Sequence, residues 1–147
     1  LDWADTFIED YKKHLPKEHQ ESMHSFSRAR LAYEKEQYGE VLQLLQRANY
    51  KDLLLNLAAK SLLQKTLYVN GAWEALESQL DAMTSFLARK DILTYPRNNY
   101  NNFAALLKKI LVLNPHDPSA KKALRAKIAE AQPLTEKQWL LEQLELI

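Results

Sequence analysis

Glu21 and His24 form a Glu-x-x-His pair, which an α-helix would place on one face. A di-iron carboxylate centre in a helical bundle needs two such pairs, and the chain contains one. The zinc-protease pattern His-Glu-x-x-His is absent, so the remaining histidines are expected to be surface residues: His14, His19 and His116. We therefore expect no metal and no cofactor.

Other catalytic patterns are equally scarce. The only glycines are Gly39 and Gly71, so the chain contains neither the glycine-rich motif of a dinucleotide-binding loop nor that of a phosphate-binding loop. The Gly-x-Ser-x-Gly motif of serine hydrolases is also absent. The chain has no cysteine, which excludes thiolate nucleophiles, disulfides and cysteine zinc sites. Carboxylates such as Glu34 and Glu36 have lysines nearby, as is typical of solvated helix faces. The prediction is a protein that is not an enzyme.

The segment 89–127 is strongly basic. It holds nine Lys or Arg residues against Asp91 and Asp117, in a chain whose net charge is only +1. Tyrosines and asparagines interleave with these bases near residue 100, a mixture that can stack on and pair with single-stranded nucleic acid. The candidate basic patch consists of Arg97, Lys108, Lys109, Lys121, Lys122 and Arg125. Solvated helix faces explain the same charges better, so nucleic-acid contact is the alternative function and not the main one.

The elements that would position these side chains are helices. Ala, Leu, Glu, Lys and Arg supply just over half of the 147 residues, while β-branched residues are few. Proline and glycine fall at intervals of helical length, with Asp117 and Thr135 as expected N-caps. These signals predict an all-α domain over 1–147 with about eight helices: 2–15, 17–37, 39–49, 51–69, 72–90, 97–113, 117–131 and 135–146.

Apolar spacing identifies the core faces. Leu76, Leu80 and Met83 follow a four-then-three helical pattern, as do Phe103, Leu107 and Ile110. The helix at 51–69 has leucines on most sides, which is typical of a helix with neighbours on two faces. We expect Leu57 and Leu63 to lie in its core.

Two internal sequence similarities indicate a repeat. Shifting the chain by 34 residues places Glu40, Leu42 and Ala48 onto Glu74, Leu76 and Ala82. A second pattern occurs once as Tyr38, Val41, Leu45 and Ala48 and again as Tyr100, Phe103, Leu107 and Ile110, closed by Asn114-Pro115. An aromatic at a helix start, followed by apolar residues at these spacings and a terminal proline, is typical of the second helix of a tetratricopeptide unit.

Residues 17 to about 115 therefore resemble the tetratricopeptide repeat (TPR) family, and the stretch 133–141 resembles the C-terminal ends of uncharacterised bacterial helical-repeat proteins. The second unit departs from the pattern at Gln79, where the first has Leu45, and the spacing breaks after residue 90. The resemblance implies antiparallel helix pairs over about 17–49, 51–90 and 97–131, stacked as a short right-handed superhelix, with a capping helix at 135–146.

The resemblance also implies a concave face made by the first helix of each unit. Matched by position, that face comprises Met23, Phe26, Arg30, Tyr33, Lys60 and Gln64. Lys60 and Gln64 stand four residues apart and would share a polar stripe suited to gripping a peptide. The alternative is that Phe26 and Tyr33 belong to the core instead.

These inferences predict a TPR-like scaffold that binds a protein or peptide partner of unknown identity. Because the first residue is Leu1 and not Met, we expect the C-terminal part of a longer chain. The most apolar run, around 53–59, is too short to span a bilayer, so no membrane insertion is expected, and a cytoplasmic location fits the lack of cysteine.

Overall fold

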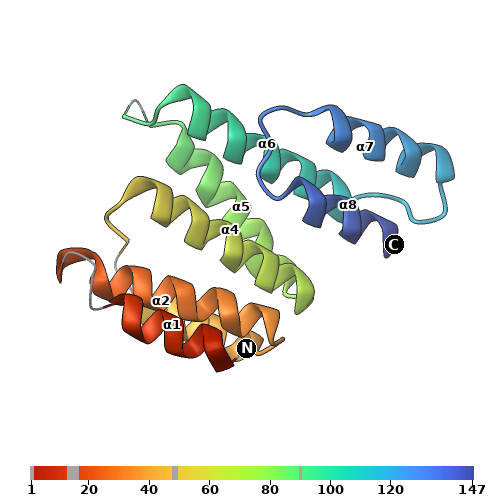
Figure 1. Ribbon diagram of the computed structural model, residues 1–147. Coiled ribbons are helices and arrows are strands. Elements are labelled where there is room, and N and C mark those ends of the chain that lie inside the picture. The colour runs from red at the N-terminus through yellow and green to blue at the C-terminus, as the bar shows by residue number, and fades with distance from the viewer. Residues whose placement is uncertain (1, 13–16, 48–49, 90) are drawn as a thin grey trace. The chain divides into compact units, whose positions relative to one another are not determined.

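The computed structural model describes residues 2–12, 17–47, 50–89 and 91–147, and within these ranges every regular element is a helix, as predicted. The helices are α1 (Asp2–Lys12), α2 (Lys17–Glu34), α3 (Tyr38–Arg47), α4 (Leu53–Val69), α5 (Trp73–Leu87), α6 (Thr94–Leu111), α7 (Pro118–Glu130) and α8 (Lys137–Glu145) (Figure 1). The chain divides into two compact units, Leu1–Leu76 and Glu77–Ile147, which are described separately.

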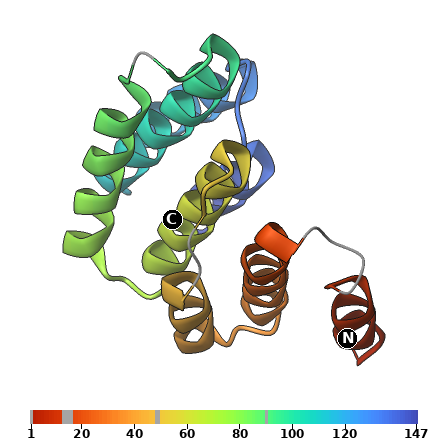
Figure 2. The same ribbon diagram turned by 90° about the vertical axis from the view of Figure 1, so that its left-hand side faces the viewer.

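In the first unit, α2 and α3 form a helical hairpin (Figure 2). Glu36 turns the chain with a left-handed φ of 60°, and Gln37 N donates to Ala32 O at 2.9 Å, which satisfies the carbonyl groups at the end of α2. The small side chains of Ala29 and Ala32 let the helices approach, and with Val41 and Leu62 they form a buried cluster. Partly buried side chains pack around this cluster: Phe26, Tyr33, Leu44 and Leu45.

Two further helices join this hairpin. The carboxylate of Asp5 on α1 pairs with Arg28, and it also accepts a 3.2 Å hydrogen bond from Lys35, so one acidic side chain ties α1 to α2. α4 packs against both α2 and α3 and begins at Asp52, whose side chain accepts a 2.9 Å hydrogen bond from Leu55 N.

The burial pattern of α4 differs from a simple leucine core. Leu57 is fully buried as predicted, but Leu63 is only partly buried. Three polar residues of the same helix, Ser61, Gln64 and Thr66, are buried. Ser61 and Thr66 donate their hydroxyls to the carbonyls of Ala58 and Leu62 in their own helix, so their burial leaves no hydroxyl unsatisfied.

In the second unit, α8 packs against both α6 and α7. Phe103 of α6 and Trp139 of α8 have ring centroids 6.3 Å apart. The predicted apolar patterns are confirmed here: Phe103, Leu107 and Ile110 of α6 and Leu80 and Met83 of α5 are buried, as is Leu76 in the first unit.

Some predicted boundaries are wrong. α6 starts at Thr94, three residues before the prediction, because Pro96 lies inside the first turn, where a missing N–H costs nothing. The expected cap Thr135 does not cap α8: the position before that helix is Glu136, with φ 60°, while Thr135 hydrogen-bonds with Tyr100. Asp117 caps α7 as predicted, accepting from Ala120 N at 3.0 Å. The predicted helix ends at 13–15, 48–49 and 90 lie outside the described residues.

Candidate functional site

The predicted concave face is largely packed against the interior of the first unit. Phe26 and Tyr33 lie against the buried cluster of α2 and α3, and Met23 is partly buried. Tyr33 also makes an edge contact with Tyr38, with ring centroids 5.5 Å apart, and Lys65 Nζ lies 4.8 Å from its ring centroid. Of these four α2 residues, only Arg30 is exposed.

The two α4 residues of that face do not form an open polar stripe, which corrects the expectation from the sequence. Gln64 is fully buried, and Lys60 is partly buried, so desolvation lowers the pKa of its ammonium group. The physical reason is that α4 contacts both α2 and α3 and has no wide solvent-facing side at this point. In this conformation Gln64 does not reach a peptide partner.

The candidate basic patch is mostly occupied by contacts within the second unit. Arg97 donates to three carbonyl oxygens, those of Leu87, Arg89 and Ile92, at 2.7–2.8 Å. Lys108 pairs with Asp81 at 2.7 Å, and Arg125 with Glu145 at 2.6 Å. Lys121 donates to the carbonyl oxygen of Ile147 at 3.1 Å. Lys109 and Lys122 are the two predicted patch residues that have no such partner among the described residues.

Two of the polar residues near residue 100, Tyr100 and Asn102, also have structural partners. Asn102 Nδ2 donates to the carbonyl oxygen of Pro133 at 2.8 Å, and Tyr100 hydrogen-bonds with Thr135, so both hold the loop before α8. Burial raises the pKa of Tyr100. Tyr95, in contrast, is exposed on the first turn of α6. The aromatic and amide groups thus do not form one continuous surface for stacking bases.

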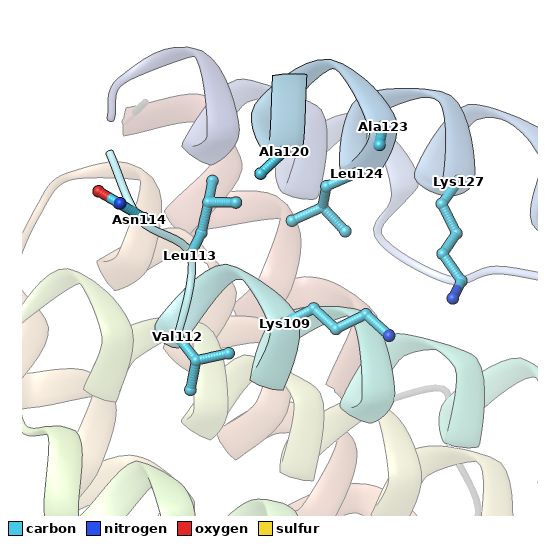
Figure 3. Close-up of a pocket in the computed structure, with 8 residues that line it drawn as sticks. All are labelled: Lys109, Val112, Leu113, Asn114, Ala120, Ala123, Leu124 and Lys127. Atoms are coloured by element: carbon cyan, nitrogen blue, oxygen red, sulfur yellow. The ribbon is translucent and has the colours of Figure 1, made fainter. Parts of the chain in front are cut away.

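A cleft of about 420 Å³ opens between the carboxyl end of α6 and the side of α7 that faces it (Figure 3). We call it the α6–α7 cleft, and its lining residues are Lys109, Val112, Leu113, Asn114, Ala120, Ala123, Leu124 and Lys127. Its volume lies within the range of about 300–1,000 Å³ that is typical of ligand sites. Five of the eight side chains are apolar, so most of the wall is hydrocarbon.

One end of the cleft is basic. Figure 3 shows that Lys109 and Lys127 extend their ammonium groups toward the same end, while Asn114 lies at the other. Hydrogen bonding with Lys109 and repulsion from its charge lower the pKa of Lys127. Within the described residues, no carboxylate pairs with either lysine. The site therefore combines an apolar wall with two adjacent lysine side chains.

Sequence reasoning named Lys109 but missed Lys127 and the apolar wall. The available signal lies on α7, where Leu124 and Lys127 stand three residues apart and therefore share a face. Counting charges over the whole segment hid this shared face.

The described residues offer no other chemical centre. They contain no group of three or more His, Asp or Glu side chains placed to hold a metal ion, and no helix among them is long and apolar enough to cross a membrane. Comparison of the chain with models of known protein families, with curated proteins and with solved structures gave no significant match.

Proposed function

We propose that this chain is a non-enzymatic, TPR-like scaffold that binds a partner protein. The observation that carries the proposal is the α6–α7 cleft, an open and mainly apolar surface on a folded helical unit. Val112 on its wall is 81% exposed, and burying such a side chain against a partner gains about 25 cal/mol per Å² of apolar area. The sequence similarity at a spacing of 34 residues and the α2–α3 hairpin support the repeat-like architecture.

Nucleic-acid binding is the weaker alternative, because four of the six predicted basic residues already have partners within the chain. Electrostatic binding to a strand needs several cations free to replace its counterions. We therefore expect a labelled single-stranded oligonucleotide to show no specific complex at about 0.15 M salt.

The function is tested with the whole chain immobilised and exposed to nuclease-treated extract of the cells that encode it. A protein retained on the chain is identified, purified and titrated back by calorimetry, and a saturable complex with a Kd below about 10 μM is expected. If every retained protein depends on nucleic acid, or none rebinds when pure, the scaffold proposal is wrong.

A further inference from the structure

The α6–α7 cleft has an apolar wall that the chain itself leaves uncovered. Val112 has the highest exposed fraction of any large apolar side chain in the described residues, and Leu113 beside it is partly buried. Both line the cleft: Leu113 faces Leu124 of α7, and Val112 lies at the rim with its side chain turned away from α7 (Figure 3). An exposed apolar side chain alone is ordinary, but one that lines a concave surface beside others marks a contact site.

The cations at the end of this wall, Lys109 and Lys127, differ from three other cations of the same two helices. Lys108, Lys121 and Arg125 lie on the same two helices, and each has an oxygen partner within 3.1 Å. Lys109 and Lys127 instead lie beside each other in the cleft, and hydrogen bonding with Lys109 and repulsion from its charge lower the pKa of Lys127. A carboxylate placed between them would replace this repulsion with two attractive, charge-assisted hydrogen bonds.

The order of these features along the cleft sets the geometry of the occupant. Figure 3 shows the two ammonium groups on one side of Leu124 and Leu113 on the other, so the cationic end and the apolar wall follow each other along the cleft. An amphipathic helix can present acidic and apolar side chains in the same way along one face. A groove between two helices is a common docking place for a third, amphipathic helix.

We propose that the α6–α7 cleft binds an amphipathic helix of a partner protein, in which an acidic side chain reaches Lys109 and Lys127 and leucine-like side chains on the same face cover Val112 and Leu113. This inference rests on the proposed scaffold function and names the partner's chemistry. Because the carboxylate is a side chain, the partner's own chain end takes no part.

The probe is a fluorescent, Ala-rich helical peptide of about 18 residues with both ends blocked, carrying two glutamates and three leucines on one face. Its controls are the same peptide with Gln for Glu and with Ser for Leu. Polarisation titrations of the whole chain should give a Kd below about 1 mM for the probe and an affinity about fivefold or more weaker for each control. Failure of the probe to bind, or equal binding of the Glu and Gln peptides, overturns the inference.

Matched protein variants locate the binding site. The double variant Lys109→Gln, Lys127→Gln should bind the Glu peptide about fivefold or more weakly, and this binding should lose most of its salt dependence. The control Lys51→Gln, Lys122→Gln removes the same charge elsewhere and should leave the affinity unchanged. Val112→Ser should weaken binding, while Leu54→Ser, at an exposed apolar residue outside the cleft, should not. Equal effects of the cleft variants and their controls overturn the inference.

The affinity of the natural partner for the double variant distinguishes the cleft inference from the scaffold proposal. If the partner binds the Lys109→Gln, Lys127→Gln variant as tightly as the original chain, the cleft inference is wrong and the scaffold function stands. If no protein partner can be reconstituted, the scaffold function itself is wrong.

Discussion

Arg97 Nε donates a 2.8 Å hydrogen bond to the carbonyl oxygen of Leu87, the last residue of α5. The same guanidinium also donates to the carbonyls of Arg89 and Ile92, so one side chain from the first turns of α6 closes the end of the preceding helix. Carbonyls at a helix end have no partner within the helix, and a cation near them is favoured by the helix dipole. The α5–α6 corner therefore depends on a planar group with several donors.

Arg97→Lys should lower the free energy of unfolding by about 2 kcal/mol, because one ammonium cannot reach three carbonyls in these directions. The matched control is Arg89→Lys, whose side chain makes an exposed ion pair with Asp91 and should cost at most about 1 kcal/mol. Urea unfolding midpoints measure both, and equal midpoints for the two variants would contradict the capping role.

Leu93→Asp should stabilise the chain by about 0.5–1 kcal/mol. Leu93 occupies the N-cap of α6, is exposed and makes no side-chain capping bond. Pro96 has no N–H to offer, so the acceptor would serve the amide of Tyr95, and its charge also suits the helix N-terminus. Leu93→Ala is the control, and a thermal midpoint no higher for Asp than for Ala would count against the prediction.

Asp5→Asn should loosen α1 without unfolding the rest of the first unit. Its carboxylate is the group that Arg28 and Lys35 share at a partly buried position, and a network of this kind contributes about 1 kcal/mol. Hydrogen exchange should accelerate in α1 and remain unchanged in α4. Asp81→Asn, which breaks one exposed ion pair in the second unit, should leave α1 exchange as it is.

Burial raises the pKa of Tyr50 to about 12. The unfolded side chain loses its proton near 10, so between these values the folded state binds more protons and stability falls as pH rises. Below pH 10 the contribution of Tyr50 to stability is fully present. Urea midpoints should drop between about pH 10 and 12, and Tyr50→Phe should reduce the drop, with the remainder arising from the raised pKa values of Tyr38, Tyr68 and Tyr100. An unchanged drop in Tyr50→Phe would show that its phenol titrates normally.

Leu57→Ala should cost about 2–5 kcal/mol through lost burial and the cavity left behind. Leu63→Ala should cost clearly less because Leu63 is only partly buried, and Leu54→Ala, at an exposed position, should stay within about 0.5 kcal/mol. This order of urea midpoints checks the orientation of α4, and a larger loss at Leu63 than at Leu57 would contradict it.

The sequence was sufficient to predict the apolar faces of α5 and α6. The periodic apolar residues Leu80, Met83 and Phe103 are buried because their spacing alone puts them on one face. The role of Arg97 was not predictable, since its partners are backbone carbonyls, which every residue has and no residue type signals. The burial of Gln64 and the meeting of Lys109 with Lys127 depend on which helices lie alongside, so a count of charges over one segment could not find them.

The buried carboxamide of Gln64 has a consequence for how uniquely α4 is oriented. Leucines at 53, 54, 55, 57, 62, 63 and 67 surround this helix, so several rotations about its axis would bury similar apolar areas. Hydrocarbon side chains do not distinguish among such rotations, whereas a polar group does, because it needs particular neighbours. Burial of Gln64 therefore distinguishes the observed rotation from the others, at the cost of desolvating a carboxamide.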